Sequence, residues 1–116
     1  MRDILKKLDG APGVLGALVM TNDGVLVAAV PEADSHDRIA AFSSMLLNSI
    51  EKDSETLGFL PIKRITFWAQ KGRLIIVPMG DFALVVIADR DSDLGFALME
   101  VAGLARSLLK RSKIEV

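Results

Sequence analysis

The sequence DRDSDLGFALME, which begins at Asp89, contains the residue types of a calcium-binding loop. Counted from Asp89, aspartates occupy positions one, three and five, and Glu100 occupies position twelve, as in an EF-hand. The sixth position of such a loop needs a glycine for its sharp turn, but here it holds Leu94. The run before the loop, FALVVIA, is also typical of a strand and not of a helix. We therefore predict no metal site, and expect Asp89 to end a strand while Ser92 or Asp93 caps the next helix.

Two further patterns resemble catalytic or nucleotide-binding motifs but lack the context that these motifs require. Ser35, His36 and Asp37 are the residue types of a hydrolytic triad, but three consecutive residues cannot align as nucleophile, base and orienting acid. The sequence GAPGVLG at 10–16 follows an expected helix and leads into an expected strand, whereas a nucleotide-binding loop requires the reverse order. A thiol nucleophile is excluded because the chain has no cysteine. The sequence predicts neither an enzyme nor a bound cofactor.

One group of cations surrounds the only tryptophan and could form a nucleic-acid patch. These residues are Lys63, Arg64, Lys71 and Arg73, around Trp68. The formal net charge of the chain is only -1, so no overall field attracts a polyanion. We interpret the cations as a solvated strand edge and predict no nucleic-acid binding.

Length and composition are those of a single globular domain over residues 1–116. Apolar residues make up 51% of the chain and charged residues 25%, which is enough apolar material to build a core. The runs GVLGALVM and FALVVIA are far shorter than the ~20 residues of a membrane-spanning helix. The first residues, MRDILKKLDG, alternate charges with leucines and lack the apolar stretch of a signal peptide. We expect a soluble, cytoplasmic protein that does not insert into membranes.

The first half of the chain predicts a short helix, a β-hairpin and a second helix. Leucines at helical spacing begin the chain, and an Asp-Gly turn at 21–24 joins expected strands at 14–20 and 25–30. Helical spacing returns from 37 to 53, with Ser35 or Asp37 available as its N-terminal cap. The residues expected on the buried face of this helix are Ile39, Phe42, Leu46 and Ile50.

The second half predicts three strands and a final helix. The strands are expected at 62–71, 74–77 and 82–88, with turns at 71–72 and 78–81, and the helix at 94–113. The residues expected on the buried face of the final helix are Leu98, Val101, Ala105 and Leu108. The element order is therefore helix, two strands, helix, three strands, helix, which is an α+β protein.

Three stretches together resemble the Roadblock/dynein light chain family. They are PGVLGALVMTNDGVLVAAV at 12–30, KGRLIIVPMGDFALVVIA at 71–88, and the Leu94-Gly95 pair that opens the final helix. The resemblance implies a five-stranded antiparallel sheet with one helix on one face and two on the other. This fold agrees with the element order that the sequence predicts.

The resemblance also implies a function without catalysis. Members of that family dimerise and bind small Ras-like GTPases, motor complexes or signalling scaffolds, so we expect a homodimeric regulator or scaffold. No single residue in this chain identifies its partner. The alternative is a small-molecule sensor of a related mixed α/β fold, although the few polar side chains expected between sheet and helix argue against it.

The exposed face of the middle helix is the predicted partner-binding surface. Small residues and a methionine allow close, adaptable contacts there, and the alternative is an ordinary solvated helix face. The predicted residues are Ala41, Ser44, Met45, Asn48 and Lys52.

The strand that contains Ile65, Thr66, Phe67 and Trp68 is the predicted dimer interface. It follows a long connection and is joined by a tight turn only to the next strand, so we expect it at the edge of the sheet. An uncovered edge with two aromatic residues is prone to aggregation, and two-fold pairing with a second copy would cover it. The alternative is a monomer whose edge is shielded by the connection at 54–61.

Overall fold

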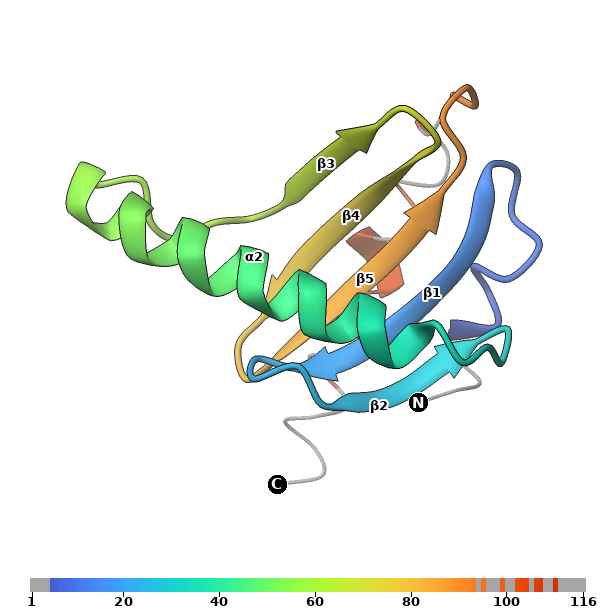
Figure 1. Cartoon of the computed structure of the whole chain (residues 1–116), viewed down its shortest axis with the longest axis horizontal. Helices are drawn as coiled ribbons and strands as arrows, with labels where there is room; N and C mark the ends of the chain where they lie inside the picture. Colours follow the sequence, from blue (N-terminus) through green and yellow to red (C-terminus); the bar gives the residue numbers. More distant parts are fainter. Residues whose placement is uncertain are drawn as a thin grey trace.

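The computed structural model describes residues 5–93 without gaps, together with 95, 99, 102–104, 106, 107 and 110. Five antiparallel strands form one sheet in the order β2-β1-β5-β4-β3, so that β2 and β3 are its two edges (Figure 1). The strands are β1 (Val14–Thr21), β2 (Leu26–Val30), β3 (Ile65–Ala69), β4 (Gly72–Met79) and β5 (Phe82–Ala88). Between β2 and β3 the chain forms the long helix α2 (His36–Leu57).

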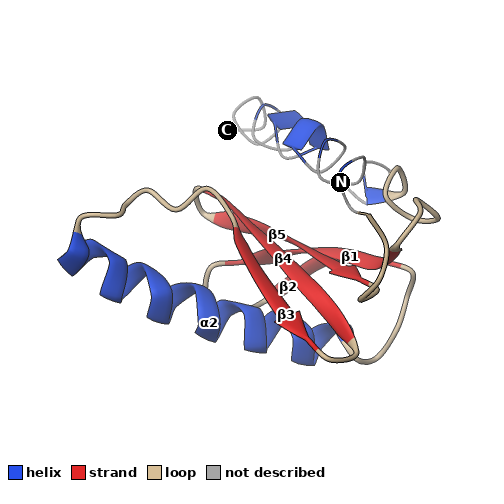
Figure 2. Cartoon of the chain, turned by 90° about the horizontal axis from the view of Figure 1, so that it is seen from above, coloured by secondary structure: helices blue, strands red, loops and turns tan. Residues whose placement is uncertain are grey.

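The sheet lies between two hydrophobic layers (Figure 2). Helix α2 covers one face, and helical residues near both ends of the chain lie over the other. The buried residues on the α2 face are Leu18, Met20, Ala40, Leu47, Ile76, Ala83 and Val85. Those on the opposite face include Leu5, Leu8, Ala17, Val19, Ile75, Leu84, Val86 and Leu104. The predicted α+β fold, with one helical layer on each face of a five-stranded antiparallel sheet, is confirmed.

Strand β5 lies in the middle of the sheet, and this position explains why its sequence is apolar throughout. Ala83 and Val85 join the core on the α2 face, while Leu84 and Val86 join the core on the other face. A strand with both faces covered needs apolar residues at every position and not only at alternate ones. The neighbouring strand β1 has the same character from Ala17 to Met20.

Helix α2 is longer than the sequence predicts and extends beyond the sheet. It ends at Leu57 instead of residue 53, and Gly58 closes it in the left-handed conformation with a φ of 76°. Its 22 residues span about 33 Å, whereas five strands place the outer strand axes only about 19 Å apart. Figure 1 shows α2 crossing the sheet from the β2 side and continuing past β3.

The buried face of α2 differs from the predicted one. The residues with the least exposed surface in its middle are Ala40, Ser43, Ser44 and Leu47. Of the four residues predicted to be buried, Ile39, Leu46 and Ile50 are half-buried, and Phe42 is 38% exposed. Large apolar side chains dominated the periodicity of the sequence, but three of these four least exposed residues, Ala40, Ser43 and Ser44, are small.

The ends of two strands also differ from prediction. Strand β3 begins at Ile65 instead of residue 62, and β4 includes Pro78, which was expected in the following turn. Pro78 pairs with Ala83 of β5, but pairing with β3 extends along β4 only to Ile76. A proline is tolerated there because no strand on that side needs its missing N–H group.

The final helix is described only in part. Leu98, Val101, Ala105 and Leu108, the residues predicted to form its buried stripe, lie outside the described residues. Gly95, Met99, Ala102, Gly103, Leu104, Arg106, Ser107 and Lys110 are helical. Within the described part of the chain, no helix is both long enough and apolar enough to cross a membrane.

Candidate protein-interaction surfaces

The β3 edge exposes the residues that the sequence predicted at a dimer interface. Within the described part of the chain, β3 pairs with β4 alone, and a two-residue turn that follows Ala69 joins the two strands. Ile65 packs against the core on the α2 face, whereas Thr66, Phe67 and Trp68 are exposed. The predicted edge position of this strand is confirmed, while the dimer contact itself stays a prediction.

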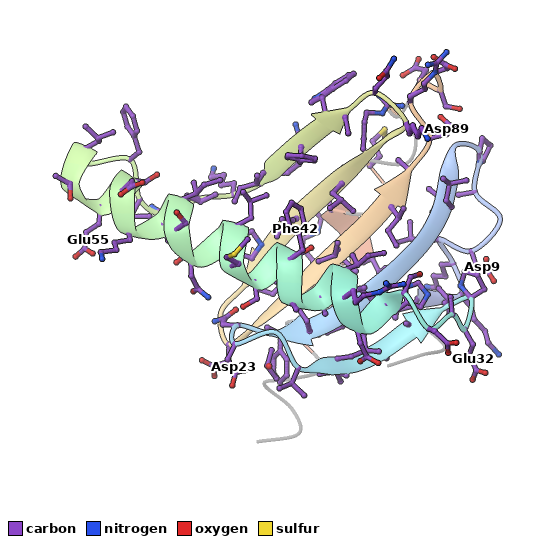
Figure 3. All side chains as sticks on the ribbon, in the orientation of Figure 1. Asp9, Asp23, Glu32, Phe42, Glu55 and Asp89 are labelled. Atoms are coloured by element: carbon purple, nitrogen blue, oxygen red, sulfur yellow. The ribbon has the colours of Figure 1, made fainter. Side chains whose placement is uncertain are left out.

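Large apolar side chains gather along the β3 side of the molecule. Phe42 of α2 is labelled in Figure 3. Its ring meets the ring of Phe67 edge to face with the centroids 5.7 Å apart, so α2 and β3 form one aromatic surface. Phe67 is 38% exposed and Trp68 is 68% exposed. The end of α2 and the connection that follows it add the exposed side chains of Leu57, Phe59 and Leu60. We call these seven side chains, Phe42, Leu57, Phe59, Leu60, Ile65, Phe67 and Trp68, the β3-side apolar strip.

Arg73 fixes Trp68 and is not available to bind phosphate. Its guanidinium carbon lies 4.8 Å from the centroid of the Trp68 ring. Arg73 is 7% exposed, and it donates from Nε to the backbone oxygen of Asp89 at 2.8 Å and from Nη2 to that of Ser92 at 2.6 Å. One of the four predicted surface cations is therefore a buried structural residue that joins β4 to the corner after β5.

Asp89 organises that corner. Its carboxylate accepts hydrogen bonds from the backbone N–H and the hydroxyl of Ser92, each at 2.8 Å, and from the backbone N–H of Asp91 at 3.3 Å. The donors on Ser92 are the main cause that lowers the pKa of Asp89, and the nearby Arg73 guanidinium adds a smaller effect. Asp93 accepts a bond from the Gly95 N–H at 2.9 Å, as an N-terminal cap does. For Asp89 and Asp93 the structural interpretation of the acidic loop is confirmed.

The described residues of the same region do not form a cluster of metal ligands. Among the residues that the structure describes, no group of three His, Cys, Asp or Glu side chains could hold a metal ion. Glu100, the twelfth residue of the loop, lies outside the described residues. The absence of calcium binding stays a prediction.

The predicted partner face of α2 is only partly exposed. Ala41 and Lys52 are exposed, and Met45 is 64% exposed. Ser44 is 6% exposed, so its assignment to this face was wrong. Asn48 is exposed, but its amide is already engaged by the hairpin below the helix.

Ser44 and Asn48 hold the turn between β1 and β2 against α2. The Ser44 hydroxyl donates to the backbone oxygen of Asn22 at 2.7 Å, and the Asn48 amide donates to the same oxygen at 3.0 Å. Gly24, with a φ of 89°, allows this close approach, because a Cβ there would lie 3.1 Å from Cβ of Ser44. A polar residue inside an apolar interface therefore has a structural role that spacing alone did not reveal.

His36 is a buried residue at the start of α2. It is 4% exposed, and its Nε2 donates to the backbone oxygen of Pro31. Its ring lies next to Gly16 of β1, where an added Cβ would be 3.5 Å from Cε1 of His36. Ser35 is the N-terminal cap residue of α2, without a hydrogen bond from its side chain.

The sequence did not predict the hollow beside β2. A space of about 480 Å³ lies between β2 and the loop that leads into α2. Its lining residues are Leu26, Val27, Ala28, Ala29, Glu32, Ala33, Asp34 and His36. Consecutive alanines next to an acidic loop were the available signal. A second hollow of about 270 Å³ lies near the turn between β3 and β4, where Phe67 and Leu74 contribute to its wall.

A family model described as "Roadblock/LC7 domain" matches residues 2–88 of this chain. Among curated proteins, the chain is similar to the uncharacterized protein MJ0714 of Methanocaldococcus jannaschii, with 26% identity over 93 residues that cover 79% of each chain.

Solved structures share the fold at low sequence identity. The Roadblock/LC7 domain from Streptomyces avermitilis superposes with a TM-score of 0.88 at 21% identity, over 100% of this chain and 98% of the other. MglB of Myxococcus xanthus superposes with a TM-score of 0.87 at 15% identity, over 97% and 94% of the two chains. The likeness to both structures covers nearly the full length of each chain.

Proposed function

The chain belongs to the Roadblock/LC7 domain family, and from this premise we propose that it is a non-catalytic homodimeric regulator that binds a small Ras-like GTPase or signalling partner. The family is one of regulators and scaffolds, and it includes proteins that act on GTPases. We further propose that the protein works in the cytoplasm. The partner and the dimer are our proposals for this particular chain.

The β3-side apolar strip is the observation that carries the proposed dimer. A single chain leaves Phe67, Trp68 and Phe59 in solvent, and it also leaves the backbone groups on the outer side of β3 without a neighbouring strand. If β3 of a second copy pairs with this strand, the apolar side chains are covered and the backbone groups are hydrogen-bonded at the same time. A two-fold axis at β3 makes the contact self-complementary, because each strip then faces its own copy.

The extent of α2 supports the same arrangement. The end of the helix that lies beyond β3 has no strand of its own sheet beneath it (Figure 1). A second sheet that continues from β3 would place strands under that end and would cover Leu57. The half-buried residue Ile50, nearer that end of α2, would also complete the burial that its spacing predicted.

The outward side of α2 is the surface we assign to the partner. Ala41, Met45 and Lys52 lie on the side of the helix that faces away from the sheet. Small side chains beside a flexible thioether suit a contact that must adapt to another protein. In the dimer two such helices would lie close together and present a continuous surface.

Two measurements test the proposal in sequence. Light scattering at micromolar concentration should give twice the chain mass. Calorimetric titration with a purified Ras-like GTPase from the same cells, loaded with GDP or with a non-hydrolysable GTP analogue, should then detect binding to one of the two forms. The doubly substituted variant Ala41→Glu with Met45→Glu should lose GTPase binding while keeping the dimer mass.

A matched control is available on the opposite side of the molecule. Met99 and Ala102 are also an exposed methionine and alanine on a helix, but they belong to the final helix. Met99→Glu with Ala102→Glu adds the same charge and should leave GTPase binding unchanged. Equal loss from both double variants, or loss from neither, would overturn the assignment of the partner surface to α2.

A further inference from the structure

We infer that the β2 edge is a second interaction site, which binds an extended basic segment of another protein by adding a strand to the sheet. This site is separate from the proposed dimer contact and lies at the other end of the strand order. Among the residues that the structure describes, β2 pairs only with β1. Its other side therefore offers a row of backbone donors and acceptors to an incoming strand.

The hollow beside β2 provides room for that strand. Four successive residues from Leu26 to Ala29 line it, and the loop with Ala33 and Asp34 forms the facing wall. Its volume of about 480 Å³ lies within the range of pockets that hold ligands. Ala28 and Ala29 are short side chains where strands usually carry bulky ones, and this shortage of side-chain volume leaves the space open.

The charge of the wall selects the occupant. The residues that line the hollow include the acids Glu32 and Asp34 and no lysine or arginine. Asp34 is exposed, and Asp37 follows it at the exposed start of α2. An extended segment rich in lysine or arginine is therefore the favoured ligand, because its charges complement this wall.

The same charges disfavour a second copy of β2 as the occupant. Figure 3 shows Asp23 and Glu32 at opposite ends of β2. In an antiparallel pair of β2 strands, the acidic end of one copy would face the acidic turn of the other. Like charges placed opposite each other destabilise a strand pair, so a basic segment of another protein is preferred to a second copy of β2.

His36 gives independent evidence for a missing ligand, because one of its ring nitrogens is buried without a hydrogen-bond partner among the described residues. It lines the hollow and is 4% exposed, and its Nε2 donates to the backbone oxygen of Pro31. Since a carbonyl only accepts, Nε2 carries the proton, and Nδ1 of the neutral ring is an acceptor. Nδ1 is buried without a hydrogen-bond partner among the described residues. A donor brought by the added segment, with a small shift of the ring, would satisfy it.

The test uses two labelled peptides and the full chain. A fluorescein-labelled peptide of about seven residues, in which valine and lysine alternate, is long enough for the ~17 Å of β2. Its counterpart has glutamate in place of lysine. Fluorescence anisotropy should show saturable binding of the lysine peptide and at least roughly tenfold weaker binding of the glutamate peptide. Amide hydrogen exchange followed by NMR should slow between Val27 and Ala29 and stay unchanged at Thr66.

Three variants locate the contact. Asp34→Lys should weaken binding of the lysine peptide by roughly fivefold, and Ala33→Trp should weaken it by filling the hollow. Asp91→Lys makes the same charge change at an exposed residue in the loop after β5 and should have no effect. All three substitutions are at exposed positions, so circular dichroism should show an unchanged fold.

The inference is wrong if the glutamate peptide binds as tightly as the lysine peptide, or if amide exchange slows at Thr66 instead of at β2. It is also wrong if light scattering shows an assembly larger than a dimer that Ala33→Trp disrupts, because a second copy would then occupy the β2 edge. Failure of the proposed GTPase regulation would leave these peptide measurements unaffected, so the two ideas are tested separately.

Discussion

The two edges of the sheet present the same backbone problem with different surroundings. At the β3 edge the exposed ladder is flanked by aromatic side chains, and α2 extends over it into solvent. At the β2 edge the ladder is flanked by alanines and an acidic loop, and a hollow lies beside it. Open backbone groups therefore do not determine what an edge binds. The side chains around them do, since an apolar self-complementary edge favours a second copy and an acidic hollow favours a basic chain.

The largest expected effect concerns the β3 edge alone. The pair that closes a two-residue turn is hydrogen-bonded, and bonded and non-bonded pairs alternate along the ladder, so we expect the Thr66 N–H to point away from β4. Thr66→Pro should therefore remove a donor from the dimer contact without breaking the β3–β4 ladder, and light scattering should show the mass fall from two chains to one. Thr66→Ala, which keeps the N–H, should remain dimeric. A monomeric wild type at micromolar concentration contradicts the proposed dimer.

A smaller effect is expected at the β2 edge from Gly16→Ala. The added Cβ would lie 3.1 Å from the backbone oxygen of Val30, so β2 must shift slightly, whereas its distance of 3.5 Å from Cε1 of His36 is an ordinary contact. Overpacking of this kind costs about 1–3 kcal/mol of unfolding free energy, which chemical denaturation would measure. The dimer should persist, because Gly16 is distant in strand order from β3. Loss of the dimer would show that the two edges are not independent.

Ser44→Ala should lower the unfolding free energy less than Gly16→Ala does, and it should also show that the β2 edge and the β3 edge respond separately. The substitution removes one of the two donors to the Asn22 oxygen, and Asn48 keeps the other. Loss of one such bond costs about 1 kcal/mol. Amide exchange should accelerate around the β1–β2 turn and remain unchanged along β3. A uniform change through the sheet would contradict a local role for Ser44.

Acid should affect the β3 side slightly more than the β2 side. The pKa of Asp89 is lowered mainly by the donors on Ser92, so its contribution to stability is present above the ordinary aspartate pKa of about 3.9 and is lost as pH falls through the lowered pKa. Asp89 accepts from Ser92, whose backbone oxygen binds Arg73, and Arg73 stacks on Trp68. As pH falls through the lowered pKa of Asp89, the fluorescence of this single tryptophan should change before the protein unfolds. Asp89→Asn should abolish that change in fluorescence.

Calcium should produce no effect at either edge. Millimolar calcium should leave the melting temperature unchanged, since Asp89 and Asp93 already bind backbone groups of their own loop. A rise of several degrees that Asp91→Ala abolishes would show that the acidic loop does bind the ion.

The sequence predicted the elements better than their surfaces. Strand β5 was evident from an unbroken apolar run, and the hairpin at Gly24 from its turn residues, because these signals are local. The buried face of α2 was not, since periodicity gives weight to Phe42 and not to Ser44. Whether a serine faces the core depends on an acceptor such as the Asn22 oxygen, which lies 22 residues away in the chain.

The candidate sites divide in the same way. The exposure of Phe67 and Trp68 followed from the position of their strand, which the order of turns fixed. The hollow at β2 also depends on how close the loop after Pro31 comes to the strand, and the consecutive alanines of β2 do not encode that distance.

Because α2 is longer than its own sheet, the stability of the proposed dimer depends on protein concentration. The end of the helix finds no support in its own sheet, so in the proposed dimer part of the folding free energy comes from a second molecule. Each tenfold dilution then weakens assembly by about 1.4 kcal/mol, and the melting temperature falls with it. A cell that makes few copies of this chain would hold a less stable protein than a cell that makes many, with no change in sequence.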